Sequence, residues 1–198
     1  MINIILLGDP AAGKATQSAL LAKKYNLRDF DMGKELLKIQ HGRGNVSAKA
    51  ALAKTFSKGK LTPTALVRDL QKKVALETPK SKGVLFDGNP KMITEAKLVS
   101  KYLKQAGRNE IVFLYLSLPQ KDIIKRMSER KVYFKRKFSK RPDDNIKALK
   151  NRLKYYNTNI REVVDFFKSK YPNRKISGLG TVQEVNARIV KAINELAN

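Results

Sequence analysis

The chain has 198 residues, of which 42% are hydrophobic, enough to form one domain with a substantial core and too many for a disordered protein. It has no cysteine and one histidine, which excludes disulfides and thiolate zinc sites and leaves little for histidine-based catalysis. No stretch approaches the roughly 20 apolar residues of a membrane span. We therefore expect no membrane segment, and we take the protein to be a cytoplasmic monomer.

The net charge is +25, from 42 Lys and Arg against 17 Asp and Glu. Such an excess attracts anions, which include nucleic acid as well as phosphorylated small molecules. The lysines are scattered along the chain, which favours a solvated lysine surface over a nucleic-acid interface. The exception is the stretch Lys131 to Arg141, where Tyr133, Phe134 and Phe138 are interleaved with basic residues. Nucleic-acid binding therefore stays open as an alternative.

The first predicted elements are an apolar strand over Ile2–Leu7 and a helix that follows a glycine-bracketed turn. Gly8 and Gly13 allow backbone torsions that turn successive amide N–H groups inward around an anion. Lys14 adds a positive charge, and the start of the helix directs its positive end to the same place. The pattern predicts a phosphate-binding loop, although the hydroxyl residue is Thr16, one position later than usual. The alternative is an ordinary turn between a strand and a helix.

Short apolar strands then alternate with helical stretches along the chain. Further strands are expected at Arg28–Phe30, Gly83–Phe86, Ile111–Leu116 and Lys175–Ser177. The alternation predicts an α/β fold with a parallel sheet and helices on both faces. The stretches 117–120 and 181–184 both fit a helix capping box, and Gly107 is placed to end a helix around Ala96–Gln105.

Two segments do not fit the alternation and are expected to be mobile flaps over the site. Residues 32–62 are helical and polar, and residues 131–140 are basic and aromatic. The longest helix is expected to start near Asp143 and Asp144. Its buried stripe is predicted to consist of Ile146, Leu149, Leu153, Tyr156, Ile160, Val163 and Phe167.

A candidate magnesium site lies where the strand over Gly83–Phe86 ends. Asp87 follows that strand directly. An acidic residue in this place, close to a phosphate loop, can hold a water molecule that is bound to Mg²⁺. We expect Asp87 to act in this way, with Thr16 nearby and without zinc. The alternative is that Asp87 and Gly88 form a simple turn.

Arginines supply the next signal. Arg126 and Arg130 are four residues apart and share a helix face, while Arg141 precedes the predicted long helix and Arg152 lies within it. Guanidinium groups bind phosphate oxygens in a bidentate manner and stay charged while a phosphoryl group moves. A solvated, salt-bridged surface would explain any one of these arginines but explains all of them together poorly.

The motifs Gly-x4-Gly-Lys-x-Thr-Gln, Gly-x-Leu-x-Asp-Gly-x-Pro, Arg-x3-Arg and Arg-x-Asp-Asp-x7-Arg-Leu occur in this order along nearly the whole chain. In these motifs the chain resembles the adenylate kinase family of nucleoside monophosphate (NMP) kinases, in the form with a short lid. The resemblance implies a single P-loop kinase domain over residues 1–198 that transfers the terminal phosphoryl group of ATP reversibly to an NMP, with AMP as the first candidate. Its parts would be a core (1–30, 63–126 and 142–198), an NMP-binding insert (31–62) and a short lid (127–141).

The resemblance also implies which residues bind ATP with its Mg²⁺. They are Gly8, Ala11, Ala12, Gly13, Lys14, Ala15, Thr16, Arg126, Arg130 and Gly180. Lys14 would bridge the donor and acceptor phosphates, Arg126 and Arg130 would clamp ATP, and Gly180 would expose its backbone to the adenine. Catalysis would then rest on Lys14, Arg126, Arg130, Arg141 and Arg152.

On the acceptor side the resemblance implies Met32, Lys38, Lys60, Leu61, Thr62, Gly88, Lys91, Glu95, Arg141 and Arg152. Here the chain departs from the family pattern. Leu37 stands where the family has an arginine for the acceptor phosphate, with Lys38 or Arg43 as candidate substitutes, and Lys91 replaces a second arginine. Glu95 aligns with the glutamine that reads adenine. An ionised carboxylate accepts but cannot donate, so recognition of the base must change.

Two further departures concern the phosphate loop and the lid. Ala11 replaces a usual glycine, and Asp9 brings a negative charge near the phosphates. Only residues 131–140 lie between Arg130 and Arg141, which excludes the long lid of some family members. Tyr133 or Phe134 would either stack on the ATP base or pack the lid down, and both interpretations stay open.

Two other functions remain as alternatives. The same fold could phosphorylate another acceptor, such as CMP, UMP, dAMP or GMP, because the departures lie on the acceptor side. The protein could also be a weakly catalytic nucleotide-binding protein that binds RNA through its basic surface.

Overall fold

A computed structural model describes the backbone of residues 1–43, 46–55, 64–129, 132–134, 137–139 and 146–197. Side chains are described in the same ranges, except those of residues 43, 128, 129, 132–134, 137–139 and 146–157. The main strands are β1 (Asn3–Gly8), β2 (Leu27–Asp31), β3 (Gly83–Asp87), β4 (Ile111–Ser117) and β7 (Asn173–Ser177). They form one parallel sheet in the order β2-β3-β1-β4-β7, which confirms the predicted strands and their parallel arrangement.

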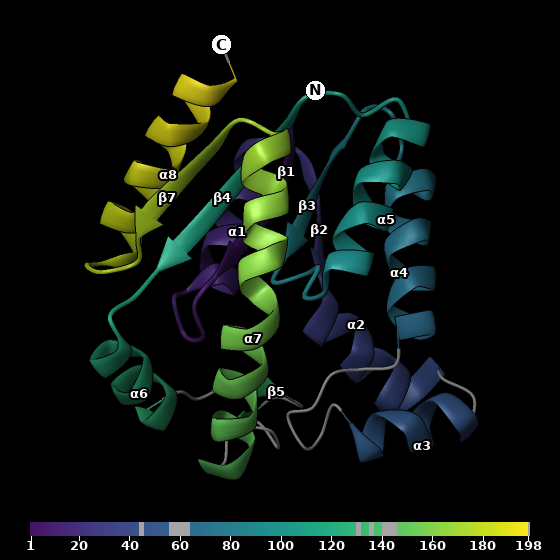
Figure 1. Cartoon of the computed structure of the whole chain (residues 1–198), viewed down its shortest axis with the longest axis vertical. Helices are drawn as coiled ribbons and strands as arrows, with labels where there is room; N and C mark the ends of the chain where they lie inside the picture. The colour runs from purple at the N-terminus through teal and green to yellow at the C-terminus, as the bar shows by residue number, and fades with distance from the viewer. Residues whose placement is uncertain (44–45, 56–63, 130–131, 135–136, 140–145, 198) are drawn as a thin grey trace.

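Helices cover both faces of the sheet, as predicted (Figure 1). On one face lie α1 (Lys14–Lys24) and α8 (Val182–Leu196), and on the other α4 (Thr64–Glu77), α5 (Ile93–Gln105) and α7 (Ile146–Lys170). Every residue of β1 is buried because alternate side chains enter the two cores. Ile4 and Leu6 pack on the side of α1 and α8, while Ile5 and Leu7 pack on the opposite side.

Two of the three predicted helix ends are confirmed. At the end of α5, Gly107 has a φ of 64°, and the N–H of Arg108 donates to the carbonyl of Leu103 at 2.9 Å. This positive φ is the conformation that glycine provides after a helix. At the start of α8, the Thr181 hydroxyl accepts from the Glu184 N–H at 3.2 Å, and the Glu184 carboxylate accepts from the Thr181 N–H at 2.7 Å.

The capping box predicted at residues 117–120 is wrong. Ser117 is the last residue of β4 and pairs with Ser177 of β7, while α6 (Gln120–Glu129) begins at Gln120 itself. Pairing in the sheet holds Ser117 away from the helix position that a capping residue would need. Its hydroxyl instead donates to the carbonyl of Ile176 at 3.3 Å.

The segments outside the strand–helix alternation lie beyond the end of the sheet toward which the strand arrows point, together with α6 (Figure 1). The first contains α2 (Met32–Lys38), a π-helical turn η1 (Ile39–Arg43) and α3 (Val46–Lys54), so the predicted helices are confirmed in its described part. The second contains β5 (Val132–Phe134) and β6 (Lys137–Ser139), which pair antiparallel. Both segments therefore lie at the end of the sheet where the phosphate loop follows β1.

The longest helix is α7, which is described from Ile146, so its predicted start at Asp143 and Asp144 lies outside the described residues. In the described part of its stripe, Ile160, Val163 and Phe167 are buried as predicted. Neither α7 nor any other helix in the described ranges combines the length and apolar content needed to cross a membrane.

Candidate active site

Backbone geometry, and not side chains, determines the shape of the loop between β1 and α1. A Cβ on Gly8 would lie 2.3 Å from the carbonyl oxygen of Leu116, so only glycine fits against β4. Gly13 has a φ of 90° and precedes α1, whose first turn contains no acidic residue. Ala11 has a φ of 58°, a left-handed conformation that costs a residue with a Cβ more than glycine. A helix N-terminus with no acidic side chain in its first turn fits the predicted anion site.

Lys14 connects this loop to the end of β3. Its Nζ donates to the carbonyl oxygens of Gly8 and Asp9, both at 2.8 Å. A Cβ on Gly88 would lie 3.6 Å from Lys14 Cε, so the predicted acceptor-side glycine lies next to the predicted phosphate-binding lysine. The structure thus brings one residue of each predicted subsite together.

The carboxylate of Asp9 is held by two donors from the β4 side of the loop. Oδ1 accepts from the Tyr115 hydroxyl and Oδ2 from the Leu118 N–H, each at 2.7 Å. The Asp9 N–H also donates to the carbonyl of Leu116 at 2.8 Å. The negative charge predicted near the phosphates is therefore already hydrogen-bonded within the protein. The sequence predicts the charge but contains no signal for these partners.

Asp87 ends β3 and is buried beside the phosphate loop. Burial and the facing Asp31 carboxylate together raise its pKa to about 7, and the Lys14 ammonium acts against both. Thr16 lies exposed in the first turn of α1. A carboxyl group in this position, next to a phosphate loop, fits the predicted role of holding a metal-bound water. In the ranges whose side chains are described, no cluster of three or more His, Cys, Asp or Glu side chains is placed to hold a metal ion.

Sequence analysis missed an acidic group on β2. Asp31 caps α2 by accepting from the Lys34 N–H at 3.1 Å, and Lys34 Nζ lies 3.5 Å from both Asp29 and Asp31. Burial lowers the pKa of Lys34, but the charges of Asp31 and Asp29 together outweigh it and raise the pKa overall. Burial also raises the pKa of Asp29. The only signal in the sequence is the preference for Asp at the position before a helix.

Glu95 is buried at the start of α5, where its Oε2 accepts from the Lys91 N–H at 2.9 Å. Burial raises the pKa of Glu95, while the amide and the charge of Lys91 act against this shift. Asn89, two residues before Lys91, accepts at Oδ1 from Gln71 Nε2 at 2.6 Å in a buried pair that sequence analysis missed. The structure therefore joins two predicted acceptor residues, Lys91 and Glu95, through the backbone N–H of Lys91 and the carboxylate of Glu95.

Other predicted acceptor residues occupy α2. Met32 is buried and packs in the core cluster on the α4 and α5 face. Lys38, a candidate substitute for the missing arginine at Leu37, pairs with Glu35 at 2.6 Å on the surface. The side chain of Arg43, the other candidate, lies outside the described residues. Lys38 could therefore contact an acceptor phosphate only after its ion pair with Glu35 is broken.

The connection between β7 and α8 lies against the phosphate loop. A Cβ on Gly178 would lie 3.1 Å from the carbonyl oxygen of Ala12, and Gln17 Nε2 of α1 donates to the Val182 carbonyl at 3.0 Å. Gly180 has a φ of 102°, and a Cβ there would lie 2.5 Å from Glu184 Oε2. This places the predicted adenine-contacting glycine on a loop that packs beside the phosphate cradle.

Arg126 is half-buried in the last turn of α6. Several other predicted residues fall outside the description: Lys60, Leu61, Thr62, Arg130 and Arg141. Arg152 lies in α7, but its side chain is among those not described, as are the side chains of Tyr133 and Phe134 in β5. The roles assigned to these residues stay predictions.

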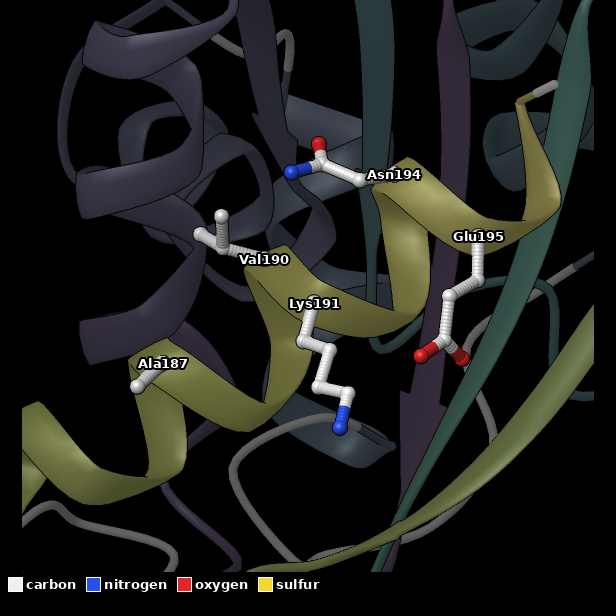
Figure 2. Close-up of a pocket in the computed structure, with 5 residues that line it drawn as sticks. All are labelled: Ala187, Val190, Lys191, Asn194 and Glu195. Carbon is white, nitrogen blue, oxygen red and sulfur yellow. The ribbon is translucent and has the colours of Figure 1, made fainter.

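A surface pocket lies elsewhere, on the C-terminal helix. Its lining residues all belong to α8: Ala187, Val190, Lys191, Asn194 and Glu195 (Figure 2). None of the predicted site residues contributes to it. The phosphate loop is therefore the better candidate for the active site, because it combines available N–H groups with a lysine and a buried carboxyl group.

Comparison with known proteins agrees with this geometry. Residues 6–171 match the family described as adenylate kinase. The chain is 34% identical to an adenylate kinase of Parabacteroides distasonis and 32% identical to one of Bacteroides thetaiotaomicron, over 99% of this chain and 100% of each relative. An adenylate kinase of Leptospira biflexa is 31% identical over 98% of this chain and 100% of its own length. The chain thus belongs to the adenylate kinase family and is a phosphotransferase of the nucleoside monophosphate kinase class.

Proposed function

We propose that this protein transfers the terminal phosphoryl group of ATP reversibly to AMP, so that ATP and AMP give two ADP. The single observation that carries the proposal is the position of Lys14, which lies between the loop carbonyls of Gly8 and Asp9 and the backbone of Gly88. A lysine there can contact phosphates of both nucleotides. The names of the relatives support adenine nucleotides as the substrates.

In the proposed mechanism the phosphate loop holds the ATP phosphates through its N–H groups and the positive end of α1. Lys14 exchanges its hydrogen bonds with the two loop carbonyls for bonds to phosphate oxygens. Phosphoryl transfer demands positioning and charge neutralisation more than covalent chemistry, and the attacking oxygen of a monophosphate is already anionic. No general base is needed, which suits a chain with one histidine.

Magnesium bound with ATP would neutralise charge on the phosphates. Asp87 would hold a water of the metal, with Thr16 nearby. Arg126 and Arg130 are proposed to clamp ATP, and Arg141 and Arg152 to contact the phosphoryl group in flight. Guanidinium groups suit these tasks because they stay charged throughout the reaction.

In the proposed mechanism each of the three parts of the chain has its own function. The core (1–30, 63–126 and 142–198) would bind the phosphates, the insert (31–62) would receive the monophosphate, and the short lid (127–141) would close over ATP. Closure would exclude water, which otherwise competes as the phosphoryl acceptor. Acceptor binding through Met32, Lys38, Lys60, Leu61, Thr62, Gly88, Lys91 and Glu95 belongs to this proposal.

The test is a coupled assay of diphosphate production with ATP and each monophosphate in turn. We expect the highest kcat/KM with AMP, and inhibition by a bisubstrate analogue that joins two adenosines through a phosphate chain. A higher kcat/KM with CMP, UMP, dAMP or GMP would show that this nucleotide, and not AMP, is the preferred acceptor. Glu95 is the reason to test these nucleotides, because a carboxylate stands there in place of the glutamine amide of the family. No turnover with any of them, together with salt-dependent RNA binding, would favour the nucleotide-binding alternative.

A further inference from the structure

Asp9 joins the phosphate loop to the end of β4 through both its backbone and its side chain. The N–H of Asp9 donates to the Leu116 carbonyl at 2.8 Å. Its carboxylate accepts from the Tyr115 hydroxyl and from the Leu118 N–H, each at 2.7 Å. Hydrogen bonds to an ionised acceptor are about twice as strong as neutral ones. We call this set, Asp9 with Tyr115 and Leu118, the Asp9 latch.

The latch holds a loop that is costly to form. Ala11, two residues further on, has a left-handed φ of 58°. Such a conformation in a residue with a Cβ persists only where its surroundings determine it. The carbonyl of Asp9 is also one of the two oxygens to which Lys14 donates. The residue that anchors the loop is thus bonded directly to the phosphate-binding lysine.

The latch also reaches the base of the lid. Leu118 begins the connection from β4 to α6, the helix that carries Arg126. Leu118, Ile123 and Met127 are buried and pack in the same core cluster as Ala12 of the phosphate loop. Fixing the Leu118 N–H therefore fixes the start of α6 relative to the loop.

We infer that Asp9 is a positioning residue for ATP binding, an inference that rests on the proposed function. Its carboxylate fixes the phosphate loop relative to the start of α6 through hydrogen bonds from the Tyr115 hydroxyl and the Leu118 N–H. Without it, the N–H groups of the loop and Lys14 would have to be ordered by ATP itself, and affinity would fall. The carboxylate accepts from both partners, and both bonds are charge-assisted. An asparagine would accept from the Leu118 N–H and could only donate to the Tyr115 hydroxyl, so both bonds would become the weaker neutral kind.

The simple electrostatic view of Asp9 makes the opposite prediction. A negative charge beside a triphosphate repels it, so Asp9→Asn should tighten ATP binding by removing the charge. If the latch positions the loop, the same substitution weakens ATP binding. Tyr115→Phe separates the two effects, because it removes one hydrogen bond of the latch and leaves the charge in place.

The experiment compares MgATP binding by calorimetry, and the KM values for ATP and AMP, in the full-length wild type and in the variants. We expect the Kd for MgATP to rise about tenfold in Asp9→Asn and about threefold in Tyr115→Phe, in the range of one lost hydrogen bond. The KM for AMP should rise less than the KM for ATP, because the loop N–H groups contact ATP alone while Lys14 contacts the phosphates of both nucleotides. The double variant should bind no worse than Asp9→Asn alone, since both changes break the same latch.

Tyr171→Phe is the matched control. Its hydroxyl donates to Ser100 Oγ at 2.7 Å, the same distance as in the latch, but it joins the end of α7 to α5 away from the loop. This variant should lose some thermal stability and keep its ATP affinity. It therefore reports what loss of a tyrosine hydroxyl does to the fold alone.

Unchanged or tighter MgATP binding in Tyr115→Phe would overturn the inference, even if Asp9→Asn did not fold. A fall in thermal stability with unchanged ATP affinity in both variants would show that the carboxylate serves the fold only. Failure of the proposed function is a separate result: the wild type itself would then produce no ADP from ATP and a monophosphate.

Discussion

The donor and acceptor sides of the site are built in different ways. Around the phosphate loop the backbone supplies the binding groups, with glycines at 8 and 13 where a side chain would collide or strain the chain. Charged side chains are frequent around the predicted acceptor side: Lys91 and Glu95 are predicted acceptor residues, and Asp29, Asp31 and Lys34 lie where β2 passes into α2. A backbone site depends on spacing and on glycine, whereas a side-chain site depends on which groups the fold places next to one another. The departures from the family pattern fall mainly among the residues predicted to bind the acceptor, such as Leu37, Lys91 and Glu95.

The largest expected effect would come from the donor side. Lys14→Ala should lower kcat by on the order of a thousandfold, because it removes a positive charge from the transferring phosphates. Steady-state assays with ATP and AMP measure this effect. Lys73→Ala is the matched control, because Lys73 is an exposed lysine of α4 with no assigned binding role and its loss should leave kcat close to that of the wild type. Turnover of Lys14→Ala close to wild type would show that the lysine does not serve the reaction.

Gly8→Ala tests the backbone construction of the donor side. The new Cβ would meet the Leu116 carbonyl at 2.3 Å, so we expect a loss of about 3 kcal/mol in the free energy of unfolding and weaker ATP binding. Chemical denaturation and calorimetry measure the two. Gly42→Ala is the control, because a Cβ there would have no neighbour within 4 Å. If both variants were equally stable, the contact with β4 would not restrict this position.

The pH dependence of MgATP binding tests Asp87. Its pKa of about 7 means that the carboxyl group is mostly protonated at pH 6, whereas holding a metal-bound water requires the carboxylate. Affinity for MgATP should therefore increase about tenfold from pH 6 to pH 8, with release of a proton. Binding titrations in buffers of different ionisation enthalpy measure both. Asp87→Asn should abolish the dependence, and a flat profile in the wild type would contradict the role of Asp87.

Ionisation of Asp87 should favour MgATP binding but lower the stability of the folded protein. The folded-state pKa of Asp87 is raised above its ordinary value of 3.8, so between about pH 4 and pH 7 the folded protein holds a proton that the unfolded chain has lost. The contribution of Asp87 to stability therefore falls as pH rises through this window. Comparing denaturation midpoints of the wild type and Asp87→Asn at pH 5 and pH 8 measures this contribution.

Glu95→Gln tests the predicted acceptor side and has the smallest expected effect on turnover. An amide both donates and accepts, as the edge of adenine requires, while keeping an oxygen for the Lys91 N–H. We expect the KM for AMP to fall by about fivefold, which corresponds to the gain of one hydrogen bond. The KM for ATP should stay the same. Asp69→Asn, an exposed change of the same charge on α4, is the control. A higher KM for AMP would show that the carboxylate serves the acceptor better than the amide.

Much of the core could be predicted because its signals are local. The apolar strand before Gly8, the glycine spacing and Lys14 lie within one short stretch, and the capping box of Thr181 and Glu184 needs only four consecutive residues. The buried stripe of α7 follows from its spacing, as Ile160, Val163 and Phe167 show. The capping box at Ser117 failed since strand pairing with β7, a long-range contact, decides what that residue does.

The sequence by itself determined the α/β class, the positions of the five parallel strands and the family, because hydrophobic periodicity and motif spacing act over neighbouring residues. It did not predict the short strands β5 and β6. Only the tertiary structure decided where the acidic side chains go. Asp9 meets Tyr115 and Leu118 more than 100 residues away, and Asp31 faces Asp87 because β2 and β3 pair in register. The physical reason is that hydrogen bonding and burial depend on neighbours in space, which the order of strands in the sheet sets and no local pattern records.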